Sequence, residues 1–451
     1  MCRLINTAAG IQCLERESFL AEKLLEKVSG EEVMGELVVV GGNPLRGRVR
    51  ISGAKNAALA VLCASVMAEG KVVLENVPDI TDIHIMIDIL KCLGAQVSRP
   101  ENGLVEMAMP PRLVDMPPYE MVKKLRASNL LLGPLLARFG RVELCLPGGC
   151  NIGTRPMDLH FKGLAALGAE LVLEKGLVKA SASRLSGSRI YLDFPSVGAT
   201  ENIMMAACLA RGQTVLENVA KEPEVVDLAN FLNCLGARIR GAGTDIIKIE
   251  GVDSLGECLR YSVIPDRIEA GTYMVAAAAT GGDVVLENVI PLHVEPISAK
   301  LREAGADVDE EGETLRVRAE GALRPLDIKT MPYPGFPTDM QPQMMALLST
   351  VNGSSMIVEN IFENRFRAAE ELIRMGANIK IEGRLAIIEG VRRLTGTRVN
   401  APDLRAGAAL VVAGLMAEGE TEIGNVGYID RGYHRLEEKL GSLGARVWRR
   451  D

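Results

Sequence analysis

The sequence has few aromatic residues, few histidines and no long hydrophobic run. Aromatic residues make up 4% of the 451 residues, with one Trp, and the formal net charge is −7. Single-stranded nucleic acid is usually bound by stacked aromatic rings and nucleic-acid backbones by basic surfaces, so we expect no nucleic-acid partner. The four histidines lie far apart and lack metal-ligand spacing. We therefore predict no metal site and no cofactor.

The nine cysteines contain no Cys-x-x-Cys pair and are scattered from Cys2 to Cys258. An odd number without regular spacing indicates reduced thiols in a cytoplasmic protein rather than a disulfide framework. Charged residues interrupt the start of the chain, so we expect neither a signal peptide nor a membrane span there. Residues 1–35 are predicted to be a disordered or loosely docked extension.

What the sequence does contain is a sixfold repeat of about seventy residues. An apolar residue followed by Gly-Ala recurs at Gly94, Gly168, Gly236, Gly305, Gly376 and Gly444. Each copy follows an amphipathic helical pattern, after which glycine is the favoured cap. The strand-like peptide Val-Leu-Glu-Asn-Val recurs at 73–77, 215–219 and 285–289, with weaker forms near Val142, Val358 and Ile423.

The third element of the repeat is a short segment that is apolar almost all round. These segments are 57–68, 130–139, 203–210, 273–280, 344–351 and 408–417. Helices without a polar face must be buried, and these are too short to span a bilayer. We therefore predict an α/β fold, an inside-out β/α prism in which two similar domains each place three β/α repeats around buried helices.

Polar residues concentrate where these apolar segments begin. Helix starts carry free N–H groups that suit anions, and Ser128 and Thr200 there are explained as ordinary caps. Capping does not explain Lys55 and Arg405, because a cation at a helix N-terminus is unfavourable unless a negative group offsets it. Threefold symmetry would bring the helix starts of each domain together. We expect two such faces to form a cleft for a small polyanion, lined by Lys55, Arg126, Arg155, Arg405 and Arg431.

Residues 147–156, Pro-Gly-Gly-Cys-Asn-Ile-Gly-Thr-Arg-Pro, form another informative segment. Three glycines between two prolines disfavour helix and strand, so we predict a mobile surface loop. Most cysteines are buried as small apolar groups. The loop around Cys150, with Arg155 five positions later, instead favours a reactive thiol that acts on an anion.

Five motifs resemble those of the enolpyruvyl transferases and occur in order between Val38 and Val447. They are residues 51–57, 125–128, 147–156 with Asp158 and Leu159, 336–341 and 429–433. The resemblance is closest to members that act on a sugar nucleotide. It implies transfer of the enolpyruvyl group of phosphoenolpyruvate to the 3-hydroxyl of UDP-N-acetylglucosamine, through a tetrahedral ketal that expels phosphate. That reaction is the first committed step of peptidoglycan synthesis.

The resemblance also implies the domain boundaries. The chain would cross between domains near residues 52–55 and 264–267, which gives one domain of residues 55–263 and another of residues 36–54 plus 264–451. Because Cys150 and Asp339 then belong to different domains, both faces would have to close around the substrates, with the Cys150 loop as a lid.

Individual roles follow from the same resemblance. Cys150 would protonate the methylene of phosphoenolpyruvate, can form an adduct with it, and is the expected target of fosfomycin. Asp339 would be the base for the sugar hydroxyl, with a helix cap as the alternative. Asp403 would orient Arg405 or share proton handling. The cations Lys55, Arg155, Arg405 and Arg431 would hold the phosphate and the carboxylate, which guanidinium groups meet with paired hydrogen bonds.

The implied sugar-nucleotide contacts form a longer set. They are Asn56, Arg126, Arg155, Pro156, Met157, Asp158, Leu159, Ser196, Val197, Gly198 and Ile361. This chain has Phe194-Pro195 where the family often has a basic residue before the serine, so Ser196 is the weakest of these assignments. His160 is taken as structural.

Two alternatives stay open. A 3-phosphoshikimate 1-carboxyvinyltransferase has the same fold but would not need the glycine-rich cysteine loop, and the sugar-nucleotide run 155–159 favours the first interpretation. A catalytically silent paralogue that binds the sugar nucleotide would be indicated by loss of Lys55, Cys150, Asp339 or Arg405, and all four are present. We expect a monomer or weak homo-oligomer with two small-molecule substrates and no membrane partner.

Overall fold

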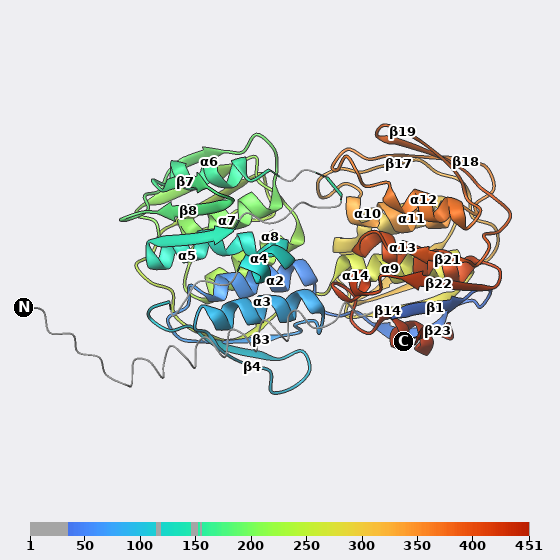
Figure 1. Cartoon of the computed structure of the whole chain (residues 1–451), viewed down its shortest axis with the longest axis horizontal. Helices are drawn as coiled ribbons and strands as arrows, with labels where there is room; N and C mark the ends of the chain where they lie inside the picture. Colours follow the sequence, from blue (N-terminus) through green and yellow to red (C-terminus); the bar gives the residue numbers. More distant parts are fainter. Residues whose placement is uncertain (1–34, 114–118, 146–151, 154–155, 451) are drawn as a thin grey trace, which may run out of the picture. The chain divides into compact units, whose positions relative to one another are not determined.

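The computed structural model describes residues 35–113, 119–145, 152–153 and 156–450 (Figure 1). Residues 1–34 of the predicted extension, together with Cys150 and Arg155, lie outside the described residues. The chain from Gly35 onward forms one compact unit.

The apolar segments of the repeat form helices with almost no exposed side chain, as predicted. In α2, for example, every residue except Asn56 is buried. A 3-10 turn, η1, leads directly into α5. The set comprises α2 (Lys55–Ser65), η1 (Arg126–Leu131) with α5 (Leu132–Phe139), α7 (Val197–Ala207), α9 (Arg267–Ala279), α11 (Gln341–Leu348) and α13 (Leu404–Met416).

The amphipathic segments form a second set of helices, and each is followed within two residues by a glycine of the Gly-Ala repeat. Those six glycines have positive φ angles between 91° and 106°, a conformation that a side chain disfavours. The set comprises α3 (Thr81–Cys92), α6 (Asp158–Ala166), α8 (Pro223–Cys234), α10 (Pro291–Ala304), α12 (Arg367–Arg374) and α15 (Leu436–Ser442). Shorter helices are α4 (Tyr119–Lys124), η2 (Thr338–Met340) and α14 (Gly427–Asp430).

The strands between residues 71 and 262 form three sheets. Their orders are β13-β3-β5-β4, β6-β8-β7 and β11-β12-β10-β9. The strands are β3 (Lys71–Glu75), β4 (Gln96–Ser98), β5 (Val105–Ala108), β6 (Arg141–Cys145), β7 (Glu170–Glu174), β8 (Leu177–Ser181), β9 (Arg189–Tyr191), β10 (Gln213–Glu217), β11 (Arg238–Arg240), β12 (Ile246–Glu250) and β13 (Cys258–Ser262).

The remaining strands form three further sheets, and two of these contain a strand from the start of the chain. Their orders are β15-β16-β14-β2, β17-β18-β20-β19 and β21-β22-β1-β23. The strands are β1 (Glu36–Val40), β2 (Arg46–Arg50), β14 (Asp283–Glu287), β15 (Asp307–Glu311), β16 (Thr314–Arg318), β17 (Ile328–Lys329), β18 (Ser354–Val358), β19 (Asn378–Glu382), β20 (Leu385–Glu389), β21 (Arg398–Asn400), β22 (Glu420–Gly424) and β23 (Arg446–Arg450).

The asparagine of the repeated strand peptide has a structural reason. Asn76, Asn218 and Asn288 have φ angles of 55° to 59°, a region that asparagine tolerates better than most residues. Each side-chain amide donates to a carbonyl beyond the neighbouring parallel strand, for example from Asn76 Nδ2 to Val263 O at 2.8 Å. The repeated residue therefore both turns the chain and joins two strands.

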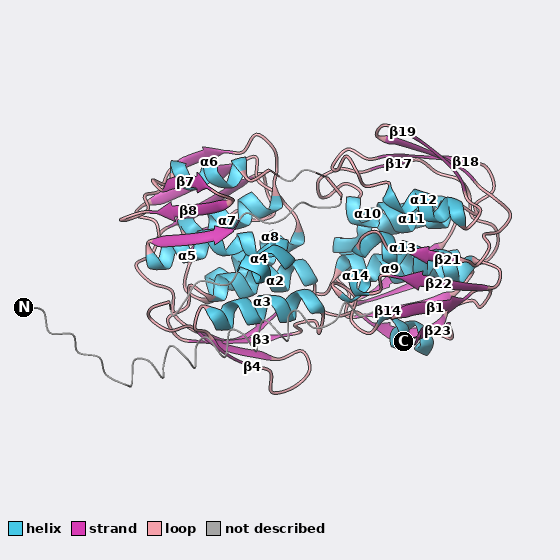
Figure 2. Ribbon diagram, in the orientation of Figure 1, coloured by secondary structure: helices cyan, strands magenta, loops and turns pink. Residues whose placement is uncertain are grey.

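The helices fall into two packed groups. Helix α2 packs on α8 and α5 on α7, whereas α9, α11 and α13 pack on one another. Figure 2 shows the helices of each group lying between its sheets. Residues 51–54 and 264–266 run side by side, since Ala54 N–H donates to Ile264 O at 2.7 Å and Asp266 N–H to Ser52 O at 2.8 Å. The division into two domains at these boundaries stays a prediction.

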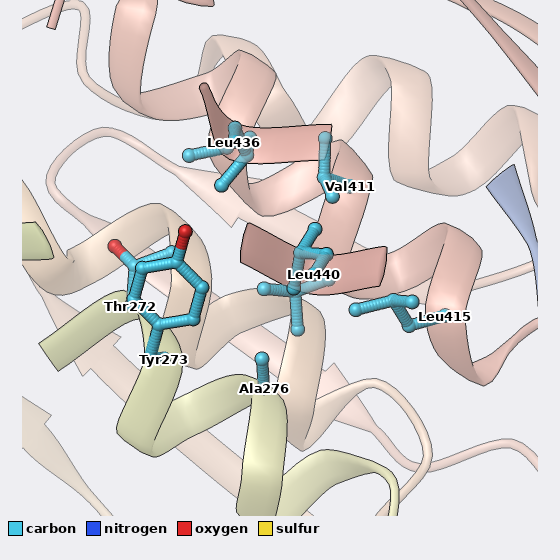
Figure 3. Close-up of a pocket in the computed structure, with 9 residues that line it drawn as sticks. Thr272, Tyr273, Ala276, Val411, Leu415, Leu436 and Leu440 are labelled. Carbon is cyan, nitrogen blue, oxygen red and sulfur yellow. The ribbon is translucent and has the colours of Figure 1, made fainter. Parts of the chain in front are cut away.

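An apolar cavity lies between α9, α13 and α15 (Figure 3). Its lining comes from Thr272, Tyr273, Ala276, Ala408, Val411, Val412, Leu415, Leu436 and Leu440. Because no charged side chain lines it, this cavity does not suit the anionic ligands expected from the sequence.

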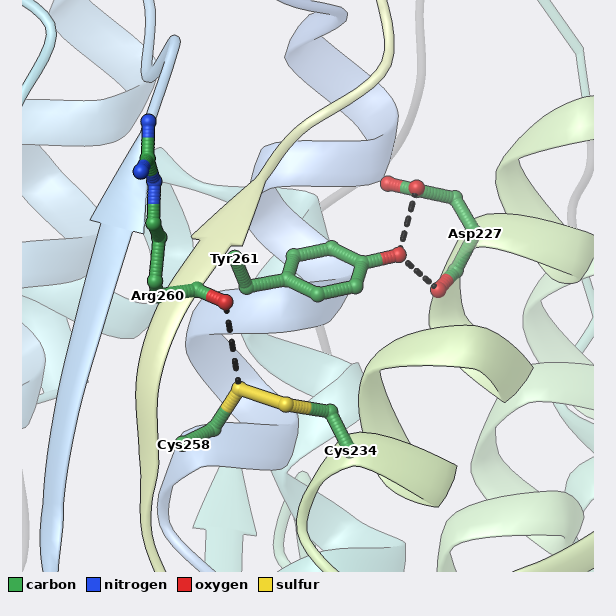
Figure 4. Close-up of a disulfide and its surroundings, with 5 residues drawn as sticks. All are labelled: Asp227, Cys234, Cys258, Arg260 and Tyr261. Atoms are coloured by element: carbon green, nitrogen blue, oxygen red, sulfur yellow. Dashed lines mark hydrogen bonds between the residues drawn. A yellow bond between two sulfur atoms is a disulfide. The ribbon is translucent and has the colours of Figure 1, made fainter.

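Cys234 and Cys258 form a disulfide, which corrects the prediction that the cysteines are reduced (Figure 4). Their Cα atoms lie 5.9 Å apart, at the end of α8 and the start of β13. Beside the bond, the rings of Phe231 and Tyr261 meet edge to face, with centroids 5.1 Å apart. The pairing depends on how helix and strand pack, which the sequence spacing does not reveal. The other cysteines among the described residues are Cys63, Cys92, Cys145 and Cys208.

Candidate active site

Lys55 is the first residue of α2, and its ammonium group is paired with a buried carboxylate. Lys55 Nζ lies 2.6 Å from Oδ2 of Asp82, in the first turn of α3, and Arg431 Nε lies 2.8 Å from Oδ1 of the same carboxylate. Asp82 therefore bridges two of the predicted anion-binding cations. The negative group expected opposite Lys55 is present within the protein itself.

The charges in this cluster shift one another's pKa values. Burial lowers the pKa of Lys55, Asp82 acts in the opposite direction, and Arg405 and Arg431 lower it further. Burial acts to raise the pKa of Asp82, but attraction to Lys55 and Arg431 outweighs burial and holds it below its ordinary value. Asp82 therefore stays ionised and stabilises both cations.

The carboxylate of Asp266 accepts hydrogen bonds from the first N–H groups of two helices, α2 and α9. Its Oδ1 accepts hydrogen bonds from the N–H groups of Ile268 and Glu269, which caps α9. Its Oδ2 accepts from the N–H of Lys55 at 3.0 Å. One carboxylate therefore fixes the start of α9 and the backbone of Lys55.

Asp339 lies in η2, with one arginine on each carboxylate oxygen. Arg365 Nη2 donates to Oδ1 at 2.7 Å, and Arg405 donates to Oδ2 from Nε and Nη2 at 3.2 and 3.1 Å. Within the described chain, neither η2 nor the following α11 is capped by a side chain, which does not favour the cap interpretation of Asp339. Paired, charge-assisted bonds of this kind fix the direction of a carboxylate.

Arg405 is buried and remains charged. Burial acts to lower its pKa, but Asp339 and Tyr433 outweigh this and raise it above its ordinary value. Tyr433 contacts the guanidinium in two ways. Its hydroxyl lies 3.5 Å from Nη1 of Arg405, and its ring centroid lies 5.7 Å from Cζ. The Tyr433 hydroxyl is held in turn by the Thr272 hydroxyl at 2.8 Å.

Asp403 caps α13 rather than contacting the guanidinium of Arg405. Its Oδ1 accepts from the N–H groups of Arg405 and Ala406 at 2.8 and 3.1 Å. Its Oδ2 is buried without a hydrogen-bond partner among the described residues. Asp403 was predicted either to orient Arg405 or to share proton handling. Its contact is with the backbone N–H of Arg405, which is compatible with the first role.

Several predicted nucleotide contacts gather at the starts of α6 and α7. Met157 precedes α6, which begins with Asp158 and Leu159 and follows the exposed Pro156. Ser196 caps α7 by accepting from Ala199 N–H at 3.4 Å, and Val197 and Gly198 form its first turn. The two helix starts are adjacent, since a Cβ at Gly198 would lie 3.2 Å from Cε1 of His160.

Three other predicted contacts lie elsewhere in the chain. Arg126 begins η1 and is close enough to His160 to lower the pKa of that imidazole. Asn56 is exposed on α2. Ile361 follows β18 in the later part of the chain, where its N–H donates to Oε1 of Glu359 at 2.8 Å.

The predictions for Cys150 and Arg155 fall outside the described residues. Residues 152–153, which the structure describes, contact the segment that carries Ile361. Asn364 N–H donates to Ile152 O at 3.1 Å, and a Cβ at Gly153 would lie 2.2 Å from Oε2 of Glu363. Part of the cysteine segment therefore lies against the segment of Ile361 and Arg365.

Asp82, Arg365 and Tyr433 were not predicted from the sequence as members of this site. Asp82 in the first turn of a helix resembles an ordinary partner of the helix dipole, and the partners of Arg365 and Tyr433 are distant in sequence. The unfavourable position of Lys55 was the available signal, because it required a nearby anion. Among the described residues, no group of three or more His, Cys, Asp or Glu side chains is arranged to hold a metal ion.

The sequence and fold are similar to those of known proteins. The model of the EPSP synthase (3-phosphoshikimate 1-carboxyvinyltransferase) family matches residues 39–440. The UDP-N-acetylglucosamine 1-carboxyvinyltransferase 2 of Carboxydothermus hydrogenoformans is 59% identical over 418 residues, which cover 92% of this chain and 99% of that protein. The UDP-N-acetylglucosamine 1-carboxyvinyltransferase of Clostridium botulinum is 54% identical over 92% of this chain and 100% of that protein.

Solved structures agree with the predicted fold. The enolpyruvyl transferase NikO from Streptomyces tendae has a TM-score of 0.83 at 26% identity, covering 92% of this chain and 99% of that chain. EPSP synthase from Acinetobacter baumannii has a TM-score of 0.73 at 20% identity, covering 92% and 100%, a likeness of fold alone. The predicted prism fold is thereby confirmed. The chain belongs to the enolpyruvyl transferase family, within its group of UDP-N-acetylglucosamine 1-carboxyvinyltransferases.

Proposed function

We propose that this protein transfers the enolpyruvyl group of phosphoenolpyruvate to the 3-hydroxyl of UDP-N-acetylglucosamine and releases phosphate. The observation that carries the proposal is the set of buried and half-buried cations around two carboxylates: Lys55 and the half-buried Arg431 on Asp82, and Arg405 and Arg365 on Asp339. Such a set suits a small anion next to a group that moves protons. The activity in the names of the relatives is the same.

In the proposed mechanism, Lys55, Arg155, Arg405 and Arg431 hold the phosphate and carboxylate of phosphoenolpyruvate. Asp339 accepts the proton of the sugar hydroxyl while the hydroxyl oxygen bonds to C2 of phosphoenolpyruvate. Cys150 donates a proton to C3. In the second step the Cys150 thiolate takes a proton back from C3 of the ketal, and the C2–O bond to phosphate breaks, which releases the enolpyruvyl ether and phosphate. The cationic groups stabilise the charge that develops on the phosphate.

The sugar nucleotide is proposed to bind along the starts of α6 and α7, with Asn56, Arg126 and Ile361. We further propose that the two helix groups act as two domains that close over both substrates, and that the reaction serves peptidoglycan synthesis in the cytoplasm. Among the described residues, none of the helices is long and apolar enough to cross a membrane.

Phosphate release by the purified protein tests the proposal. We expect release only when phosphoenolpyruvate and UDP-N-acetylglucosamine are both present, and alkylation of Cys150 by fosfomycin, detected by mass spectrometry with Cys150→Ser as the control. Replacing the proposed base, Asp339→Asn, should lower kcat by about 100-fold or more. Release with shikimate 3-phosphate instead, or with neither acceptor, would contradict the proposal.

A further inference from the structure

Glu359 is a fully buried carboxylate directly after β18, and it lies outside the set of residues predicted from the sequence. Oε1 accepts from the N–H groups of Ile361 and Phe362 at 2.8 and 3.1 Å. The Thr330 hydroxyl also donates to Oε1, at 2.9 Å, and the Thr338 hydroxyl donates to Oε2 at 2.9 Å. A buried carboxylate requires such donors, and these bonds hold its neighbours in fixed positions in return.

Three of the four groups that donate to Glu359 belong to two segments of the candidate site. One is η2, which carries Thr338 and the proposed base, Asp339. The other is residues 360–365, here called the 360–365 loop, which carries Ile361 and Arg365. One side chain therefore anchors the turn of the base and a proposed nucleotide contact.

Arg365 connects the 360–365 loop back to η2. Its Nε donates to the Thr338 carbonyl at 3.2 Å, and its Nη2 donates to the Asp339 carboxylate at 2.7 Å. The guanidinium is 1% exposed, so little solvent screens these bonds. Residues 338 and 339 are consequently held by Glu359 through a hydroxyl, and by Arg365 through a carbonyl and a carboxylate.

We propose that Glu359 is a positioning residue for proton transfer by Asp339, acting through the Thr338 hydroxyl and through the loop that presents Arg365. The inference rests on the proposed function. Glu359 is fully buried, so it acts on the reaction through these partners rather than by touching substrate. A displacement of about 1 Å in a group that reacts can lower the rate about 100-fold, so loss of the anchor should appear in kcat.

The two segments predict different kinetic effects. Thr338→Val removes the bond to Oε2 and leaves the bonds of Oε1 to the 360–365 loop. We expect a kcat about 10- to 100-fold lower, with the KM for UDP-N-acetylglucosamine within about twofold of wild type. Glu359→Ala releases both segments and should lower kcat and raise that KM.

Two further variants serve as controls. Thr280→Val is the same substitution at the C-cap of α9, where the hydroxyl accepts from Leu45 N–H at 3.2 Å, and it should leave kcat unchanged. Glu359→Gln should restore kcat to within about threefold of wild type. Its amide oxygen can accept from the loop N–H groups, and its NH2 can donate to the Thr338 oxygen.

A double variant decides whether Thr338 acts through Asp339. In the Asp339→Asn background, Thr338→Val should cause no further loss of kcat beyond about twofold. If Thr338→Val lowers kcat by the same factor in the wild-type and Asp339→Asn backgrounds, the inference is overturned and the proposed function stands. Wild-type kcat in Thr338→Val would do the same. A wild-type protein inactive with both acceptors would overturn the proposed function and this inference together. Thr338→Val and Glu359→Gln keep the test valid if Glu359→Ala does not fold.

Discussion

At the scale of single residues, the candidate site is organised by carboxylates that bridge cations. Asp82 lies between Lys55 and Arg431, and Asp339 between Arg365 and Arg405. Removing one member of a buried ion pair leaves an uncompensated charge, which costs about 3–5 kcal/mol. These side chains therefore stabilise the fold as well as the proposed site, and kinetic variants at them require a stability measurement beside each rate.

His160 shows how neighbours fix the state of one buried group. Gly133 N–H donates to Oδ1 of Asn202 at 2.6 Å, and the amide Nδ2 donates to Asn129 O at 2.8 Å, which sets the orientation of the amide. The same Nδ2 lies 3.0 Å from Nδ1 of His160. Nδ1 is therefore the acceptor and Nε2 carries the proton. Burial, followed by the charge of Arg126, lowers the pKa of His160 to about 4.

This shift predicts a pH dependence of stability. The folded-state pKa of His160 is about 4 and the ordinary value is 6.5, so the unfolded chain binds the extra proton first as the pH falls. The stability contributed by neutral His160 is complete above pH 6.5 and is lost as the pH falls through 4, by up to about 3 kcal/mol. Urea unfolding across this range should show a loss of stability in wild type that is smaller in His160→Gln. An NMR titration midpoint of the His160 ring near 6.5 would contradict this.

At the scale of helices, the N-termini of α2, α9 and α13 are held by two aspartates, Asp266 and Asp403. Asp266 satisfies N–H groups of α9 and the N–H of Lys55 in α2, whereas Asp403 satisfies only α13. The first N–H groups of a helix have no partner within the helix, so each cap has a measurable contribution to stability. The two aspartates form a natural comparison.

Asp266→Ala should therefore destabilise the protein more than Asp403→Ala. We expect a loss of about 2–4 kcal/mol for the two helices that Asp266 caps and about 1–2 kcal/mol for the one that Asp403 caps, measured by denaturant unfolding. Asp266→Asn should fall between wild type and Asp266→Ala, because the amide oxygen can still cap α9 while its NH2 cannot accept from Lys55. Equal losses for the two alanine variants would show that the contact with α2 contributes nothing.

Much at this scale could be predicted from the sequence. The periodic apolar segments, the Gly-Ala peptide and the Val-Leu-Glu-Asn-Val peptide each mark local structure, so the buried helices, their neighbours and the strands followed from short-range patterns. The position of Lys55 at a helix start predicted an anion, but it did not identify Asp82. The partners of Arg365 and Glu359 were also not predictable, because those contacts depend on how separate repeats pack. The Cys234–Cys258 pair was missed for the same reason.

At the scale of the whole molecule, the disulfide joins helix α8 to strand β13, which leads into residues 264–266, where the chain is predicted to cross between domains. Cys258 lies in β13, which pairs with β3 and is followed by residues 264–266 beside residues 51–54. Tyr261 of the same strand donates its hydroxyl to Oδ1 of Asp227 in α8 at 2.7 Å. The bond and this contact together fasten β13 to α8, as Figure 4 shows.

Reduction of this disulfide should lower the free energy of unfolding by about 3 kcal/mol, the value expected when a covalent loop of this length opens. Unfolding in denaturant with and without dithiothreitol measures the effect. The Cys234→Ser, Cys258→Ser double variant should show no response to the reductant, which separates this bond from the remaining thiols. Thiol counting on protein purified without reductant tests whether the bond forms, and full reactivity of both cysteines would contradict it.

The position of β1 has a consequence for biosynthesis. Its Val38 pairs with Glu422 of β22 on one side and with Trp448 of β23 on the other. A ribosome adds roughly 5–20 residues per second, so β1 emerges roughly 20–80 s before either neighbour exists. Until translation reaches Gly424, this apolar segment has no native strand partner and is exposed to mispairing with other nascent chains. The sheet of β21, β22, β1 and β23 can be completed only after β23 has been synthesised.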